Sequence, residues 1–219
     1  LQPALAQLVD PLQTAFVAGR WIGDNVLYHQ ALAHWLQHSG QPAAQLLLDI
    51  EKAYDRVHRQ WLYRVVAAMG FGPHLQRWVR LMTSDGTARV IVNGHRSDAF
   101  PVRNGLEQGG TLSPVLWVLQ LEPLTAYLHH LSAVGRLRTP VLPDGSPAPP
   151  VSHHADDTIL TVSDLDTDGP VAKAAVQLFC RASNAAENAS KGRGVTLGTH
   201  RPVHGPDPGT CLLYTSPSP

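Results

Sequence analysis

The chain has 219 residues, 43% of them hydrophobic and 16% charged, and its 17 basic residues equal its 17 acidic residues. This length suits one sizeable domain or one domain with an appendage, and the zero net charge gives no sign of a polyanionic partner. Two cysteines without a CxxC pair argue against a disulfide scaffold or a zinc site, and no apolar run is long enough to span a membrane.

The first 42 residues predict two helices joined by a loop. Apolar residues recur at helical spacing over Leu1–Leu12, and Gln13–Arg20 is a loop with a basic end. The chain begins in the middle of this pattern, so we expect a fragment whose missing parts would carry any charge that binds nucleic acid. Asp24 is expected to cap the second helix, which Ser39-Gly40 ends. The expected apolar face of this helix includes Val26, Leu27, Ala31, Trp35 and Leu36.

The next segment predicts a buried strand and two helices. Gln45–Ile50 is a continuous apolar run broken by Asp49, which is typical of a buried strand with an acid at its carboxyl end. Lys52–Met69 and His74–Ser84 then show helical spacing, with a break at Gly70–Pro73. The side chains expected to point inward are Trp61, Leu62, Val65 and Val66 on the first helix and Leu75, Trp78, Leu81 and Met82 on the second.

A β-hairpin and a long helix follow. Thr87–Val92 and Ser97–Val102 flank Asn93-Gly94, a strong signal for a two-residue hairpin turn. After the polar, glycine-rich stretch Asn104–Gly110, Ser113 is expected to cap a long helix with proline at its first position. A segment rich in proline and glycine then connects this helix to the next strand.

Val151–Val162 carries two adjacent acids, Asp156 and Asp157, between two short apolar runs. The β-branched residues of Thr158–Val162 predict a strand, and the residues before the acids predict a shorter one. The two carboxylates would therefore lie at the tip of a tight hairpin. Like charges side by side repel each other, and a bound divalent cation would remove that repulsion.

The last part of the chain predicts one more helix and a short strand. The helix is expected over Val171–Asn188 and the strand over Val195–Leu197. Residues 200–219 have no periodicity and are rich in proline, glycine and serine, and their end resembles translated sequencing-adapter sequence. We therefore exclude this tail from the domain as an expected artefact.

Asp49 is the third acid that we expect beside Asp156 and Asp157. A strand that ends in one acid and a hairpin tipped with two supply the carboxylates that a two-metal phosphoryl-transfer site requires, with metals about 3.5–4 Å apart. A single Asp at a strand end is more often a capping or turn residue. The three acids together favour catalysis.

Four segments resemble, in order, the motifs of reverse transcriptases. Asp49–Asp55 is similar to the first catalytic motif, Arg103–Pro114 to the second (RxGxxQGxxLSP), His154–Asp157 to the third and Asn188–Lys191 to the fourth (NxxK). Gln13–Arg20 resembles the fingers segment QTGFVPGR. The hairpin before the second motif and the long insert before the first point to the non-LTR (LINE-like) retrotransposon branch.

The resemblance implies an α+β fold: a polymerase palm with an antiparallel sheet backed by helices around a ferredoxin-like core. Residues 1–42 would be part of the fingers and residues 43–199 the palm, with the thumb absent. The implied reaction is RNA-directed DNA synthesis, in which two Mg²⁺ ions (or Mn²⁺) support transfer of dNTPs to a DNA 3′ end. The implied partners are an RNA template, a DNA primer or target and dNTPs, without a membrane, in the nucleus or cytoplasm.

The resemblance also implies roles for the acids and for one aromatic residue. Asp49, Asp156 and Asp157 would form the catalytic, metal-binding set, the first two as direct ligands and Asp157 through its charge and outer contacts. Tyr54 would lie under the incoming sugar and exclude a 2′-hydroxyl. Its alternative role is that of an aromatic core residue.

Five further residues would bind substrate. Gln108 would hydrogen-bond near the nucleotide or template, the backbone at Gly109 would approach the substrate closely, and Arg103 belongs to the same motif. Arg20 would grip the triphosphate, and Lys191 would protonate or neutralise the leaving pyrophosphate. A solvated loop arginine and a surface lysine are equally weighted alternatives for these two residues.

The sequence departs from the family pattern at three positions. His154 replaces the usual Tyr or Phe, and Ala15 and Ala18 stand where Gly and Pro are usual. His154 keeps open a catalytically dead remnant of a retroelement, and the motifs also permit an intron-encoded or other prokaryotic reverse transcriptase. A phospho-receiver domain is disfavoured, because its paired acids come first in the chain and here they come last.

Overall fold

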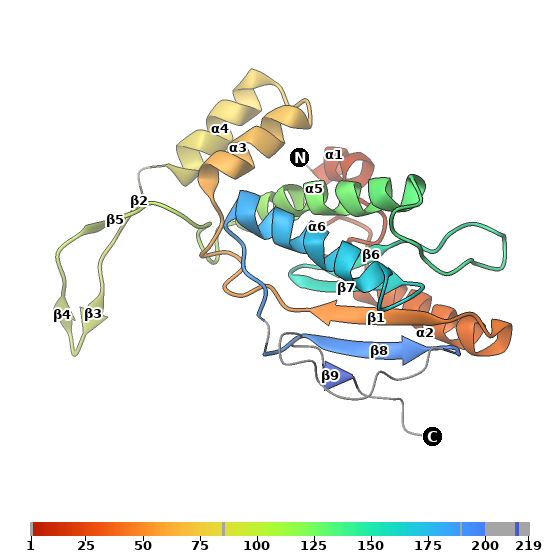
Figure 1. Ribbon diagram of the computed structural model, residues 1–219. Coiled ribbons are helices and arrows are strands. Elements are labelled where there is room, and N and C mark those ends of the chain that lie inside the picture. Colours follow the sequence, from red (N-terminus) through yellow and green to blue (C-terminus); the bar gives the residue numbers. More distant parts are fainter. Residues whose placement is uncertain (1, 85, 189, 200–212, 215–219) are drawn as a thin grey trace.

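A five-stranded sheet organises the fold (Figure 1). The structure, a computed structural model, describes residues 2–84, 86–188, 190–199 and 213–214. The strand order is β6-β7-β1-β8-β9, and all neighbours are antiparallel except β8 and β9, which are parallel. The strands are β1 (Ala43–Leu48), β6 (Val151–His154), β7 (Asp157–Val162), β8 (Arg193–Leu197) and β9 (Leu213–Tyr214).

Helices cover both faces of this sheet. Because side chains alternate along a strand, Leu46 and Leu48 of β1 point into the main core, where α5 (Ser113–Ala133) and α6 (Asp168–Ser183) pack. Ala43 points the other way and packs with α2 (Ile22–Ser39) in a second, smaller cluster. This arrangement agrees with the predicted antiparallel sheet backed by helices.

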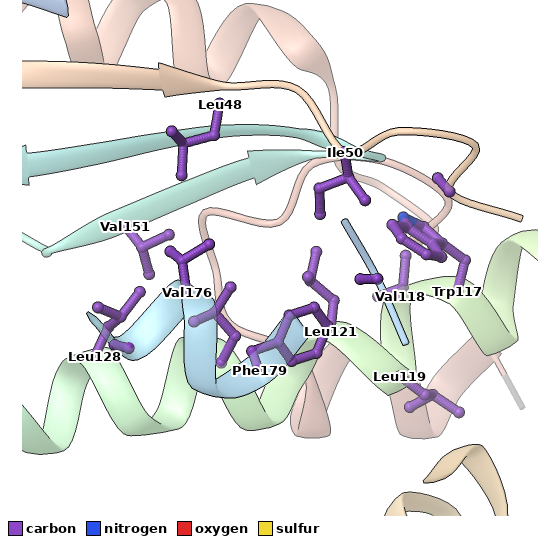
Figure 2. Packing of buried hydrophobic residues seen from close by; sticks show 14 of the residues in the cluster. Leu48, Ile50, Trp117, Val118, Leu119, Leu121, Leu128, Val151, Val176 and Phe179 are labelled. Carbon is purple, nitrogen blue, oxygen red and sulfur yellow. The ribbon is translucent and has the colours of Figure 1, made fainter. Parts of the chain in front are cut away.

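The main core lies between β1, β6 and the two helices α5 and α6 (Figure 2). Leu121 of α5 and Phe179 of α6 point toward Ile50 at the end of β1, while Leu128 and Val176 approach the sheet beside Val151. α5 is buried on nearly all sides, as expected for a helix that is apolar all round. Each fully buried large apolar side chain of α5 contributes about 1.5–3 kcal/mol to the stability of the fold. The packing of α5 therefore holds the sheet in place.

The remaining elements lie at the periphery. Short strands form the hairpin predicted before the second motif, but its ladder is interrupted, and its tip projects away from the sheet (Figure 1). No helix in the described parts of the chain is both long and apolar enough to cross a membrane. These elements are α1 (Gln2–Leu8), α3 (Arg59–Ala68), α4 (Pro73–Thr83), β2 (Gly86–Ala88), β3 (Ile91–Val92), β4 (His95–Arg96) and β5 (Phe100–Val102).

The helix predicted from Lys52 begins only at Arg59. Residues 51–56 form turns, and Lys52 has a positive φ of 47°. The backbone here bonds to other segments: the N–H of Glu51 donates to the carbonyl of Ala186, and the carbonyl of Tyr54 accepts from the N–H of Leu106. These long-range bonds replace the helical ladder, so the first motif is a loop that faces the second and fourth motifs.

The inward face predicted for α4 is wrong for three of its four residues. Trp78, Leu81 and Met82 are 60%, 64% and 57% exposed, whereas Val79 is buried and Leu75 packs partly against the core. On α3, by contrast, the predicted core residues Leu62, Val65 and Val66 are buried. The apolar stripe of α4 therefore points to solvent.

The apolar face predicted for α2 is also largely wrong. Val26 and Leu27 are 48% and 61% exposed, whereas Leu36 is buried as predicted and Leu32, which was not predicted, is buried as well. Two predicted caps differ as well, because Trp21 rather than Asp24 precedes α2, and Ser113 forms no side-chain cap bond. The end of α6 comes earlier than predicted, at Ser183, because Asn184 adopts a left-handed conformation. Most of the predicted tail, residues 200–219, lies outside the described residues.

Candidate active site

The sheet register brings three carboxylates to one edge. Leu48 of β1 pairs with Thr158 of β7, so the next residues along the two strands, Asp49 and Asp157, come opposite each other. Asp156 lies in the turn between β6 and β7. The predicted hairpin tipped with two acids is present, with a third acid at the end of the neighbouring strand.

The turn that carries Asp156 is held by the N-terminal segment. His154 pairs with Asp157, and Ala155 between them has φ 58°, a left-handed conformation that costs energy for a residue with a Cβ. The side chain of Gln13, only 1% exposed, accepts a hydrogen bond at 3.3 Å from the N–H of Ala155. The hydroxyl of Thr14 lies 3.0 Å from Nδ1 of His154. Sequence reasoning missed these contacts.

A cavity of about 340 Å³ gathers most of the predicted site residues. Lys191 Nζ lies 3.4 Å from Asp49 Oδ1, and the carbonyl of Asp49 accepts from the N–H of Asn188 at 2.8 Å, so the fourth motif is bound to the first. The walls are Asp49, Ile50, Glu51, Lys52, Ala53, Tyr54, Gln108, Asp156, Asn188 and Lys191.

Negative charge dominates this edge. Burial raises the pKa of Asp157, and the charges of Asp156 and Asp49 raise it further. Burial likewise raises the pKa of Tyr54, with Asp156 adding to the effect. Carboxylate oxygens are the ligands that Mg²⁺ prefers, and a divalent cation would relieve this repulsion, so the donor chemistry suits a metal. Within the described residues, however, no three His, Cys, Asp or Glu side chains are arranged to hold one.

Tyr54 is fixed by stacking and by its backbone. Its ring stacks on Trp117 of α5 with 5.9 Å between centroids and an interplanar angle of 21°. The carbonyl of Tyr54 accepts from the N–H of Leu106 at 2.9 Å. Tyr54 is thus part aromatic core residue and part cavity wall.

The first and second motifs are packed directly together. Gly105 has φ +86°, and a Cβ added there would lie 2.9 Å from the carbonyl oxygen of Asp55. Gln108 Nε2 donates to Asp55 Oδ1 at 2.9 Å. A carboxylate only accepts hydrogen bonds, so Gln108 must present its NH₂ group to Asp55 and keep its oxygen free. Asp55 was not among the predicted site residues.

Asp157 lies opposite Asp49 but does not line this cavity, and three other predicted residues are placed elsewhere. The guanidinium of Arg20 donates to the carbonyls of Val9 (2.9 Å), Gln13 (2.8 Å) and Asp10, in the segment that follows α1. Arg103 lines a different cavity, beside the root of the projecting hairpin. Gly109 has φ +90° and open space on its Cβ side. It follows Gln108 in the chain but does not line the cavity of about 340 Å³ that contains Asp49 and Asp156, here called the carboxylate cavity.

A polar network that includes His153 of β6 lies next to the hairpin formed by β6 and β7. No sequence pattern predicted it. Asp10 pairs with His129 at 3.0 Å, and the N–H of Asp10 donates to Glu122 at 3.3 Å. Burial raises the pKa of Glu122 to about 7. Burial also lowers the pKa of His153 to about 4, and its ring nitrogens lie 3.0 Å and 2.9 Å from the hydroxyls of Thr125 and Thr158.

The chain matches the protein family described as reverse transcriptase (RNA-dependent DNA polymerase) over residues 1–206. It is 33% identical over 199 residues to the transposon TX1 uncharacterized 149 kDa protein of Xenopus laevis, covering 91% of this chain and 15% of that protein. It is 30% identical over 152 residues to a retrovirus-related Pol polyprotein from type-1 retrotransposable element R2 of Popillia japonica, covering 69% of this chain and 24% of the relative. The chain thus spans less than a quarter of each relative.

Solved structures of telomerase share the fold. The apo enzyme from Candida tropicalis superimposes with a TM-score of 0.61 at 14% identity, covering 90% of this chain and 35% of that one. The Candida albicans enzyme in complex with a telomeric RNA fragment gives 0.61 at 13% identity, covering 82% of this chain and 32% of that one. The predicted α+β polymerase fold is confirmed, and so is the resemblance to non-LTR retrotransposon proteins. The chain belongs to the reverse transcriptase (RNA-dependent DNA polymerase) family.

Proposed function

We propose that this domain catalyses RNA-directed DNA synthesis, in which a dNTP is added to a DNA 3′ end on an RNA template. The observation that carries the proposal is the single cavity of about 340 Å³ that joins Asp49 and Asp156 to Tyr54, Gln108 and Lys191. It combines an acid that follows β1 and an acid in the turn between β6 and β7 with a cation and an aromatic ring, which together suit a nucleoside triphosphate.

Reverse transcriptase domains generally use divalent metal ions. Here Asp49 and Asp156 would hold Mg²⁺ or Mn²⁺. Asp157, which lies opposite Asp49 in the pairing of β1 and β7, would add negative charge beside the ions. When bound, two such ions lower the barrier by activating the 3′-hydroxyl and stabilising the charge on the leaving pyrophosphate. Burial raises the pKa of Asp157 and the charges of Asp156 and Asp49 raise it further, and a bound cation would offset both effects.

The other cavity residues act on the nucleotide directly. The ammonium of Lys191, held 3.4 Å from Asp49, lies where it would neutralise or protonate pyrophosphate. The ring of Tyr54, fixed on Trp117, would exclude a 2′-hydroxyl from the sugar position. Gln108 would accept a hydrogen bond from the nucleotide or template through its free oxygen.

The main alternative is a catalytically dead remnant that keeps this fold. The presence of all three acids and of Lys191 beside Asp49 favours the active enzyme. An intron-encoded or prokaryotic enzyme is the second alternative, and the transposon relatives favour a LINE-like element.

The test is Mg²⁺-dependent incorporation of dNTPs on a primed RNA template. Asp49→Asn and Asp156→Asn should each lower incorporation at least about 100-fold, since each removes a carboxylate charge at the site of developing charge. Asp166→Asn is the matched control, because Asp166 is an exposed acid outside the cavity. If Asp156→Asn incorporates as well as the control, the catalytic assignment is wrong.

A further inference from the structure

The turn between β6 and β7 contains a backbone conformation that is unfavourable for its residue. His154 pairs with Asp157, so Ala155 and Asp156 are the two central residues of the turn. Ala155 has a φ of 58°, whereas the φ of Asp156 is not positive. A two-residue hairpin turn with positive φ at its first central position usually carries glycine there, because a Cβ is crowded in that conformation. An alanine at this position therefore depends on contacts from outside the turn.

The side chain of Gln13 supplies such a contact from the segment that follows α1. Its amide oxygen accepts hydrogen bonds from the N–H of Ala155 at 3.3 Å and from the N–H of Ala15 at 3.0 Å. A neutral amide oxygen adds no negative charge beside Asp156 and Asp157, whereas a carboxylate at the same place would increase the repulsion there. The amide therefore suits a contact to a turn that carries two acids.

The backbone around Gln13 is fixed on the outer edge of β6. Gln13 forms a parallel bridge with His153. The N–H of His153 donates to the carbonyl of Leu12 at 2.9 Å, and the N–H of Thr14 donates to the carbonyl of His153 at 3.1 Å. The carbonyl of Gln13 accepts from the guanidinium of Arg20 at 2.8 Å. These bonds hold the Gln13 amide at a defined place relative to the turn.

The segment 12–14 contacts each of the three residues that precede Asp156. Besides its bonds to His153 and Ala155, it approaches His154, whose Nδ1 lies 3.0 Å from the hydroxyl of Thr14. Asn25 of α2 reinforces this arrangement, because its Nδ2 donates to the carbonyls of both Leu12 and His153, at 3.0 Å and 2.9 Å. The position of the turn is therefore set by the N-terminal segment as well as by the pairing of β6 with β7.

We propose that Gln13 is a positioning residue for Asp156. Its amide oxygen holds Ala155 in the left-handed conformation and so fixes the direction in which the Asp156 carboxylate leaves the turn. Gln13 does not itself line the carboxylate cavity. This inference rests on the proposed function, in which Asp156 holds a metal ion. The alternative is that Gln13 only satisfies its own backbone through Ala15.

The first test is amide hydrogen exchange, measured without nucleotide or metal ion. Gln13→Met keeps the length of the side chain and removes its oxygen, so the amide hydrogen of Ala155 should exchange about tenfold faster. The amide of Leu160, within β7, should keep its rate. Gln45→Met is the matched control, because Gln45 is also buried and its side chain bonds to His29. This control should leave the exchange of Ala155 unchanged.

The second test measures incorporation and its rescue. Gln13→Met should lower kcat for dNTP incorporation about tenfold and raise the Mg²⁺ concentration required for the half-maximal rate, because a displaced carboxylate binds the ion poorly. The KM for dNTP should stay within about twofold. Ala155→Gly removes the Cβ, so the turn no longer depends on the bond. In a protein that carries Ala155→Gly, the addition of Gln13→Met should therefore lower kcat less than about threefold.

Two results would overturn the proposal. One is an unchanged exchange rate of Ala155 in Gln13→Met, and the other is a loss of kcat that is equally large with and without Ala155→Gly. If Gln13→Met does not fold, Gln13→Asn takes its place in both tests. Its amide keeps the polarity of the site but is one methylene too short to reach the N–H of Ala155.

Failure of the proposed function would be seen separately, as no incorporation by the unsubstituted protein on a primed RNA template. The exchange rates do not depend on incorporation, so they would still show whether Gln13 holds the turn. Conversely, a protein that incorporates dNTPs and shows the same exchange of Ala155 with and without Gln13→Met would keep the proposed function and refute the role of Gln13.

Discussion

Lys191 and Asp49 lie 3.4 Å apart, which joins the segment before β8 to the end of β1. The Lys191 side chain is 65% exposed, so this ion pair should contribute at most about 0.5 kcal/mol to stability. Its value would lie in placing a cation beside the candidate nucleotide site.

We therefore predict that Lys191→Met leaves the free energy of unfolding within about 0.5 kcal/mol of the original and lowers dNTP incorporation about tenfold. Urea unfolding and single-turnover incorporation measure the two effects. Lys173→Met, on α6, serves as the control for loss of a lysine charge. A large loss of stability with unchanged incorporation would show that Lys191 is a structural residue only.

The hydrogen bond between Gln108 and Asp55 predicts a change in nucleotide affinity. Asp55→Ala frees the amide of Gln108 to rotate, so the KM for dNTP should rise about fivefold with little change in kcat. Asp55→Asn keeps an acceptor oxygen and should retain most of the affinity. Steady-state kinetics measure KM and kcat for dNTP in each variant. Equal effects of Asp55→Ala and Asp55→Asn would rule out a role of Asp55 in positioning Gln108.

The stacking of Tyr54 on Trp117 predicts a change in sugar selection. Tyr54→Val removes the ring, so ribonucleotide incorporation relative to deoxynucleotide should rise at least about tenfold. The lost stacking should cost about 1 kcal/mol of stability. Tyr54→Phe keeps the ring and should keep the selectivity. Competition assays with matched dNTP and rNTP pairs measure it, and unchanged selectivity in Tyr54→Val would leave Tyr54 as a core residue.

Glu122 and His153 should make stability depend on pH in opposite directions. The pKa of Glu122 is raised to about 7, so its contribution is fully present below pH 4.5 and is lost as pH rises through 7. The pKa of His153 is lowered to about 4, so its contribution is present above pH 6.5 and is lost as pH falls toward 4. In the unsubstituted protein the two effects oppose each other between pH 4.5 and 7.

Glu122→Gln should remove the opposing Glu122 effect and leave that of His153. The free energy of unfolding of this variant should rise by about 2–3 kcal/mol between pH 4.5 and 7, more steeply than in the unsubstituted protein. Urea unfolding at the two pH values measures the difference. The same pH slope in both proteins would mean that Glu122 is ionised in the folded state at neutral pH.

Much of the candidate site could be predicted because its chemistry is tied to local pattern. An apolar run that ends in Asp49 and a hairpin signal around Asp156 suffice to place two acids at strand ends. The resemblance to the reverse transcriptase motifs then implies that Gln108 and Lys191 join them. The two strand ends follow from short-range sequence rules, whereas the places of Gln108 and Lys191 follow from that resemblance alone.

Other features depend on which neighbour covers a residue, and periodicity does not report that. The stripe of Trp78 and Leu81 has correct helical spacing, but α4 turns it to solvent and buries Val79 instead. The turns after Asp49 replace a helix because the backbone there bonds to segments remote in sequence. The bonds of Arg20 to the carbonyls of Val9 and Gln13 were not predicted either, because periodicity does not indicate which acceptors an arginine reaches.

The contact between Gln13 and Ala155 has a consequence for the order of folding. The two residues are 142 positions apart, so closing this contact costs more chain entropy than forming the hairpin itself. We expect the strands β6 and β7 to pair early and the strained turn that carries Asp156 to gain its last hydrogen bond late. The candidate active site would then be completed only after the sheet has formed, when the segment around Gln13 packs against the turn between β6 and β7.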